Sequence, residues 1–201
     1  MTDRPRTARP EEGRRRHDPD RRERIIAACL DVIAESGVAG TSHRKVAAAA
    51  DVPLGSMTYH FDGMDELLHE AFGRFAASAG ERFEALMASA RDRAEAERAI
   101  TALVSENVFA TSRELVLTHE LYTLAAREPA YRDLTDSWTA RCRAALERHF
   151  DPDTARMLDA LIGGLTVHRA LDAEPQDPAL VAAAVRRIAA PGGSVAGRSP
   201  S

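Results

Sequence analysis

The fold of this chain is decided by residues 41–61, which read TSHRKVAAAADVPLGSMTYHF. Thr41 or Ser42 is a suitable helix N-cap, and the short helix that begins there is expected to end at residues 51–53, Asp-Val-Pro, because proline disfavours helix in the residue before it. Another short helix is expected over residues 54–60. Two short helices joined by a tight turn indicate a helix-turn-helix, whose second helix enters the major groove of DNA.

A longer helix is expected immediately before this pair, over residues 20–36. Its apolar residues recur at helical spacing: Ile25, Ile26, Cys29, Leu30 and Ile33. Gly37 follows them and is a typical helix stop. Residues 20–61 therefore predict a three-helix DNA-binding unit.

The rest of the chain is also expected to be helical. The whole chain contains 38 alanines but only 12 glycines and 10 prolines, and alanine is the best helix former. We expect a long helix over 64–91, capped by Asp62, and further helices at 94–112, 114–127, 130–150, 153–173 and 178–189. The predicted fold is all-α, with about nine helices: an N-terminal helix-turn-helix domain followed by a helical bundle.

Charge divides the chain in the same way. Residues 1–60 carry 11 basic and 9 acidic side chains, whereas residues 61–201 carry 16 and 22. We expect four parts: a flexible Arg-rich arm (1–19), the DNA-binding domain (20–63), an acidic helical domain (64–190) and a disordered tail (191–201). A basic arm of this kind can lie along phosphates, but solvated tails are as common.

Several classes of protein are disfavoured. No apolar run approaches 18 residues and no signal-peptide pattern is present, so a cytoplasmic protein without a membrane partner is expected. Cys29 and Cys142 lie within apolar helical patterns and are interpreted as buried small hydrophobic residues. The sequence has no nucleophile, nucleotide or paired-histidine metal motif, so neither a catalytic residue, a cofactor nor a metal site is expected.

A family resemblance rests on residues 24–68. The pattern Arg24-Ile-Ile-x-Ala-x-Leu-x-x-Ile-x-x-x-Gly37, then Thr41, Val46-Ala47, Ala50-Asp-Val52, Gly55-Ser-Met-Thr-Tyr-His-Phe61 and Leu67-Leu68, resembles the TetR family of transcriptional regulators. The resemblance implies a dimeric regulator, most often a repressor, that binds a palindromic operator and is released by a small molecule. Two positions depart from the family pattern: Thr58 stands where a Tyr is usual, and Met64 where a Lys is usual.

Ten residues are candidate DNA contacts. The hydroxyls and amides at the start of the first short helix suit a phosphate, the basic pair after them suits the backbone or a guanine edge, and the small residues of the second helix suit close approach to bases. The resemblance implies phosphate contacts for the Tyr-His pair. The candidates are Thr41, Ser42, Arg44, Lys45, Leu54, Gly55, Ser56, Thr58, Tyr59 and His60. Each hydroxyl could instead be a simple cap, and His60 could be a core residue.

The acidic remainder is expected to dimerise and to bind a small-molecule effector of partly apolar character. Dimer candidates lie on the last two helices, where Gly163-Gly164 suggests a close helix approach: Met157, Leu161, Leu165, His168, Val181 and Val185. Effector candidates are mainly large apolar or aromatic residues: Phe83, Met87, Phe109, His119, Tyr122, Trp138, Arg141 and Cys142.

Two other functions remain open at this point. An all-α enzyme would show turnover without DNA affinity. A helical protein-interaction module would show no salt-dependent binding to duplex DNA and would tolerate Tyr59→Ala. The last helices could also cover a monomeric core without forming a dimer interface.

Overall fold

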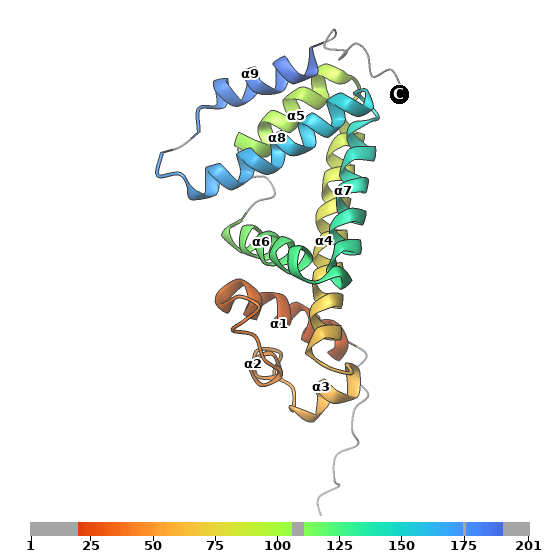
Figure 1. Cartoon of the computed structure of the whole chain (residues 1–201), viewed down its shortest axis with the longest axis vertical. Coiled ribbons are helices and arrows are strands. Elements are labelled where there is room, and N and C mark those ends of the chain that lie inside the picture. The colour runs from red at the N-terminus through yellow and green to blue at the C-terminus, as the bar shows by residue number, and fades with distance from the viewer. Residues whose placement is uncertain (1–19, 106–110, 175, 191–201) are drawn as a thin grey trace, which may run out of the picture.

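The computed structural model describes residues 20–105, 111–174 and 176–190, and this part of the chain contains nine α-helices, one 3-10 turn and no strand (Figure 1). The elements are α1 (Arg21–Ser36), α2 (His43–Ala49), α3 (Gly55–His60), α4 (Met64–Ser89), α5 (Arg93–Ser105), α6 (Ser112–Arg127), η1 (Pro129–Tyr131), α7 (Arg132–Leu146), α8 (Pro152–Leu171) and α9 (Pro178–Ala189). The predicted all-α fold is confirmed. The Arg-rich arm and the C-terminal tail lie outside the described residues.

The signals that end and begin the first helices act as expected. Gly37 closes α1 with a φ of 68°, and its N–H donates to the carbonyl of Ile33 over 2.8 Å. The hydroxyl of Ser42 accepts from the N–H of Lys45 and caps α2. These caps fix where α1 stops and α2 starts, and so fix the angle between them.

Asp51 forms the turn between α2 and α3. Its φ of 52° lies in the left-handed region, which aspartate adopts more readily than most residues. The N–H of Val52 then donates to the carbonyl of Ala47 over 3.0 Å. This sharp reversal separates α2 from α3, and the predicted helix-turn-helix is confirmed.

The α4 helix connects the two ends of the molecule. Its 26 residues extend for about 39 Å, and it lies alongside α7 in the long axis of the molecule (Figure 1). The expected cap at Asp62 is wrong: Gly63 occupies the N-cap position without a side-chain bond, and Asp62 instead donates its backbone N–H to the Glu66 carboxylate over 2.5 Å.

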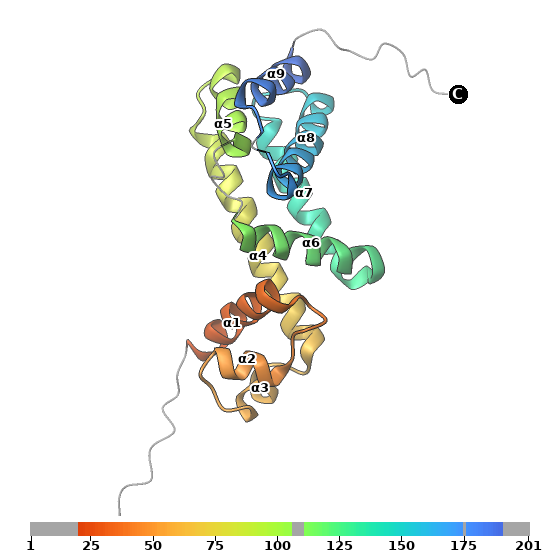
Figure 2. The same ribbon diagram turned by 90° about the vertical axis from the view of Figure 1, so that its left-hand side faces the viewer.

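Two buried clusters share α4. The first joins α1, α2 and α3 to the N-terminal half of α4 and to Leu117, Leu121 and Ala125 of α6. The second joins Phe83 and Met87, near the end of α4, to α5, α7, α8 and α9. The division expected between residues 63 and 64 therefore does not separate the two cores. Figure 2 shows α6 lying between the N-terminal helices and the α5–α8–α9 group.

Both cysteines are free thiols, and the predicted burial holds for Cys29 but only in part for Cys142, which is half-buried. Cys29 is fully buried in α1, and burial raises the pKa of its thiol to about 12. None of the helices in the described ranges is long and apolar enough to cross a bilayer.

Candidate functional site

The outer surface of the α2–α3 pair carries most of the candidate DNA contacts. Leu54 and Tyr59 are large side chains with 55% and 80% of their surface exposed, which is unusual for residues of this size. Arg44, Lys45 and Thr58 are exposed beside them, as is Gly55. The pair therefore presents basic, aromatic and small residues on one side.

The inner surface of the same pair is apolar and holds it in place. Val46 and Ala47 of α2, and Met57 of α3, are buried in the core that they share with α1. Phe61, just after α3, is also buried, and the Arg22 guanidinium lies 4.9 Å from its ring centre. Because the core side of α3 is anchored at Met57 and Phe61, the residues between them are directed outward.

Ser56 does not belong to the exposed set. Only 7% of its surface is accessible, so its hydroxyl cannot reach a base edge without a rearrangement of α3. It alternates with the exposed Gly55 because a six-residue helix packed on one side must bury part of every turn. We therefore omit Ser56 from the proposed contacts.

Four other candidates have structural partners of their own. The hydroxyl of Thr41 donates to the carbonyl of Gly37 over 2.8 Å, and that of Thr58 donates to Gly55 over 3.3 Å. The ammonium of Lys45 donates to the carbonyl of Gly40 over 2.7 Å. The half-buried His60 ring meets Tyr59 edge to face at 4.9 Å. Their positions are thus fixed before any partner arrives, which lowers the entropy lost on binding.

The position of Met64 explains one departure from the family pattern. Met64 is the first residue of α4 and packs against the N-terminal core. It therefore adds to that core and offers no charge for a phosphate. The exposed Arg44 and Lys45 remain as cations on the α2 surface.

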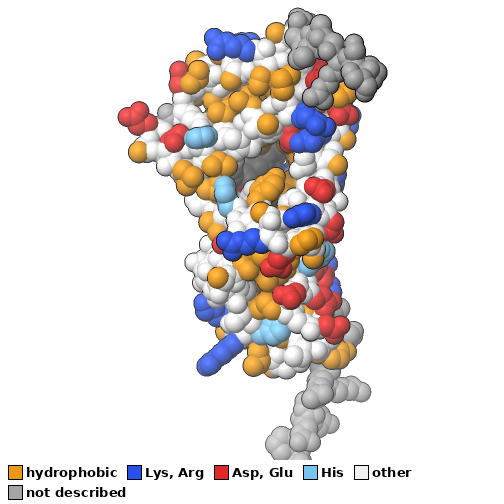
Figure 3. Space-filling view, in the orientation of Figure 1, with side chains coloured by type: hydrophobic (Ala, Val, Ile, Leu, Met, Phe, Trp, Pro, Cys, Tyr) orange, Lys and Arg blue, Asp and Glu red, His pale blue; other side chains and the backbone are white. Residues whose placement is uncertain are grey.

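A cavity of about 510 Å³ lies between α4, α6, α7 and α8. That volume falls in the range of small-molecule sites. Figure 3 shows a hollow in the middle of this face with hydrophobic side chains around it. The aromatic part of the lining is formed by Phe75, Phe83, Tyr122 and Trp138.

Five of the eight effector candidates line this cavity: Phe83, His119, Tyr122, Trp138 and Cys142. Two do not. Met87 is fully buried in the second core, and its carbonyl is bonded to the ring of His149. Arg141 is turned to Glu84, with a bond of 2.8 Å. Phe109 lies outside the described residues.

Charged groups in the cavity lining occur as ion pairs between helices. Arg82 of α4 pairs with Glu114 of α6, and Arg143 of α7 bonds Asp159 of α8 over 2.9 Å. The sequence reasoning missed all four. A helical wheel of α6 offered one signal, since Glu114, Thr118 and Tyr122 recur every four residues and share a face.

The Cys142 thiol forms part of the wall of the cavity. Burial raises its pKa to about 12, so the thiol remains protonated near neutral pH. Burial also raises the pKa of Tyr122 above its usual value. Both groups therefore act in the cavity as neutral side chains. In the described ranges, no cluster of three or more potential metal ligands is present.

The α6 helix has a second role besides lining the cavity. On its opposite side, the Glu120 carboxylate accepts from the backbone N–H of Val38 over 3.2 Å, directly after α1. Near its start, Arg113 bonds Asp31 of α1 over 2.7 Å. One rigid helix thus contacts both the cavity and the segment that leads into the helix-turn-helix.

The exposed side of α8 carries most of the dimer candidates. Met157 is 46% exposed, Leu161 and Leu165 are partly exposed, and His168 is exposed. A Cβ atom added to Gly163 or Gly164 would meet nothing within 4 Å in the same chain. Gly163 lines the cavity, whereas Gly164 is exposed outside it, so the close helix approach that Gly164 permits is not made inside the protomer.

Val181 and Val185 are in the wrong place for a dimer contact. Both are buried, because the apolar stripe of α9 packs inward on α5 and the second core. Accessible apolar residues of α9 include Leu180, which is 64% exposed, and the partly exposed Ala184 and Ile188. Figure 3 shows hydrophobic side chains gathered over this upper part of the molecule.

Comparison with known proteins gives consistent results. Residues 25–71 match the bacterial regulatory proteins of the tetR family, and residues 91–191 match the tetracyclin repressor-like C-terminal domain. The Streptomyces coelicolor A3(2) protein SCO7518, named as a transcriptional regulator, is 57% identical; the match covers 86% of this chain and 99% of that one, with a TM-score of 0.80. SCO1917 from the same organism, a member of the TetR family, is 35% identical over 85% of this chain and 99% of its own, with a TM-score of 0.69.

A third relative has been solved with ligands. The multidrug binding protein EbrR complexed with ethidium is 35% identical, and the match covers 84% of this chain and 98% of that one, with a TM-score of 0.70. EbrR has also been solved with proflavin and with malachite green. No curated protein matches the chain.

Proposed function

Because this chain belongs to the tetR family of bacterial regulatory proteins, we propose that it binds a palindromic operator as a homodimer and leaves it when a small molecule occupies the cavity. The chain is a transcriptional regulator, and its family is one of regulators and not of enzymes. Repression is the mode that we propose. The observation that carries the proposal is that α6 contacts both the cavity and α1 with the segment that leads into the helix-turn-helix.

The proposed DNA contact uses the outer side of α2 and α3. Tyr59 and His60 would bond phosphates, while Leu54, Gly55 and Thr58 would face base edges. Arg44 and Lys45 would contact the backbone from α2. The acidic remainder of the chain repels phosphate, so this side is the favourable one for a duplex.

The proposed dimer pairs the exposed side of α8 with its own copy about a two-fold axis. Met157, Leu161 and Leu165 supply apolar contact, and Gly164 allows close approach of the two α8 helices. Accessible residues of α9, led by Leu180, extend this surface. Two α8 and two α9 helices would then form a four-helix bundle.

The proposed release mechanism is a shift of α6. A ligand against Thr118 and Tyr122 displaces or fixes α6, and the contacts of Glu120 and Arg113 transfer that change to α1. The two α3 helices then no longer match half-sites about 34 Å apart. A coupling of roughly 1 to 3 kcal/mol would weaken operator binding about 5- to 150-fold.

Selection of bound duplexes from a random pool tests the proposed function. We expect a palindrome, because a two-fold dimer requires two-fold symmetric half-sites. Tyr59→Ala should weaken binding to every selected duplex by a similar factor of about ten per site, since phosphate contacts carry no sequence information. Asp136→Ala, which removes an exposed carboxylate of α7, is the control and should leave binding unchanged. Failure to enrich any site would contradict the proposal.

Replacement of Glu120 tests the proposed coupling. In Glu120→Ala, α6 loses its bond to the Val38 N–H while the cavity keeps its lining. With proflavin as the probe, we expect the factor by which dye weakens operator binding to fall about fivefold, a loss of roughly 1 kcal/mol of coupling. The affinity for dye should change little. Asp136→Ala again serves as the control, and an unaltered coupling factor in Glu120→Ala would exclude this contact from the release mechanism.

A further inference from the structure

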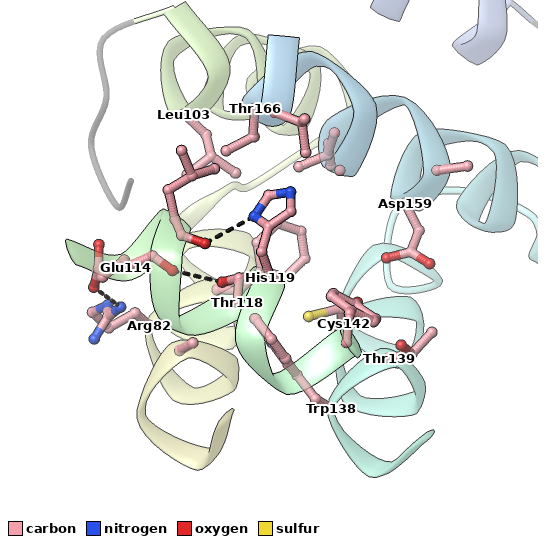
Figure 4. Close-up of a pocket in the computed structure, with 18 of the residues that line it drawn as sticks. Arg82, Leu103, Glu114, Thr118, His119, Trp138, Thr139, Cys142, Asp159 and Thr166 are labelled. Carbon is pink, nitrogen blue, oxygen red and sulfur yellow. Dashed lines mark hydrogen bonds and ion pairs between the residues drawn. The ribbon is translucent and has the colours of Figure 1, made fainter. Parts of the chain in front are cut away.

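The His119 ring offers an unused hydrogen-bond acceptor to the cavity. Its Nδ1 lies 2.9 Å from the carbonyl oxygen of Leu115. A carbonyl can only accept, so Nδ1 carries the proton in this bond and Nε2 of the neutral ring is left with a lone pair. Figure 4 shows the ring of His119 projecting from α6 into the cavity.

Asp159 offers a second acceptor from the α8 side. Its Oδ2 accepts from Nε of Arg143 over 2.9 Å, whereas Oδ1 has no hydrogen-bond partner in the described ranges. Glu114 differs, because one of its oxygens is engaged by Arg82 and the other accepts from the Thr111 N–H. Asp159 is therefore the cavity carboxylate that keeps one oxygen available as an acceptor for a ligand. Figure 4 shows it across the cavity from His119.

A wall of stacked aromatic rings lines the same cavity. The rings of Tyr122 and Trp138 are nearly parallel, with 23° between their planes and 6.2 Å between their centres. The ring of Phe75 meets that of Trp138 edge to face, with 5.7 Å between their centres, and this contact fixes the orientation of the indole. Such a wall favours a planar aromatic molecule, because stacked rings bury area without a polar penalty.

We infer that the cavity selects a planar aromatic ligand with hydrogen-bond donors at two separated positions, one for His119 Nε2 and one for Asp159 Oδ1. This inference rests on the proposed effector role of the cavity. His119 and Asp159 are its specificity-determining residues: the ring system stacks on the aromatic wall, and two N–H groups reach the two acceptors. Aromatic diamines fit this description.

The two acceptors belong to different helices, which gives the ligand a further effect. His119 is part of α6, whose far side holds Val38, and Asp159 is part of α8, whose outer side carries the proposed dimer contact. A ligand with two donors links the two helices directly. A ligand with one donor, or none, binds the aromatic wall but leaves α6 and α8 unlinked.

Two dyes of the same ring system and charge test the inference. Proflavin has two amino groups with N–H donors, whereas acridine orange has both amino groups fully methylated. The wild-type protein should bind proflavin about tenfold more tightly, roughly the net value of one hydrogen bond. His119→Phe and Asp159→Asn should each lose most of that preference, measured by fluorescence titration of both dyes.

Glu84→Gln is the matched control for Asp159→Asn. Glu84 is also a carboxylate bonded to an arginine between two helices, but it does not line the cavity. It should keep the full preference for proflavin. Equal affinity of the wild type for both dyes, no binding of either dye, or an unchanged preference in both cavity variants would each overturn the inference. Operator selection by ligand-free protein is independent of these titrations, so failure of the regulator function would be seen separately.

Discussion

A Gly164→Arg variant should be monomeric and should bind the selected operator at least a hundredfold more weakly than the parent chain. Gly164 lies on the exposed side of α8, beside Leu161 and Leu165, at the centre of the proposed dimer contact. A long charged side chain there prevents the close approach of two helices and places two like charges across the axis. Loss of the second half-site contact removes an avidity of about 10² to 10⁴. Sedimentation and operator titration would measure the two effects together.

The protomer itself should tolerate this substitution. A Cβ at Gly164 meets nothing within 4 Å, and replacing a helical glycine adds roughly 0.5 to 1 kcal/mol of helix propensity. Ala88→Arg, at an exposed alanine near the end of α4, is the control for the added charge and should remain dimeric. A dimeric Gly164→Arg protein with normal operator affinity would place the subunit interface elsewhere.

A Gly40→Ala variant should be strongly destabilised. A Cβ at this position would stand 2.3 Å from the carbonyl oxygen of Ser36, a backbone atom that cannot move without opening the end of α1. We expect a loss of about 3 kcal/mol, the upper range for overpacking at a rigid site. For a chain of this length that lowers Tm by roughly 10 °C, measurable by calorimetry.

Gly55→Ala provides the comparison for this effect. A Cβ at Gly55 meets nothing within 4 Å, and the residue is the first of α3. Its substitution should leave Tm unchanged or raise it slightly, because the unfolded chain loses freedom. If Gly40→Ala melted at the same temperature as Gly55→Ala, the turn between α1 and α2 would not have the close packing that its backbone shows.

The helices were predictable because their ends are marked locally. Gly37, Ser42 and the prolines at 152 and 178 act on the backbone within a residue or two, whatever packs around them. The exposed side of α3 was predictable for a related reason: a short helix that is anchored at Met57 and Phe61 can turn only its other residues to solvent. Ser56 was the exception, since neighbouring polar residues on a helix do not share a side.

The cavity and the dimer surface were less predictable. Met87 and Val185 recur at the spacing of an apolar helix side, and this spacing is the same for a core and for an interface between subunits. Periodicity shows that a helix has an apolar side, but it does not show which element covers that side. Arg82 and Arg141 are similar arginines on different helices, and only the packing of α4 on α7 decides that Arg141 turns to Glu84. Such pairings join residues far apart in the chain.

The shared core of α1, α4 and α6 limits how this regulator can be recombined. A chimera that joins residues 1–63 to the sensing half of another regulator would separate α1 from Leu117, Leu121 and Ala125, which complete its hydrophobic packing. The interchangeable unit is therefore discontinuous in sequence: the first three helices, the start of α4 and the inner side of α6. A chimera built on this scaffold must therefore transfer that side of α6 together with the first three helices, or redesign the apolar contact between them.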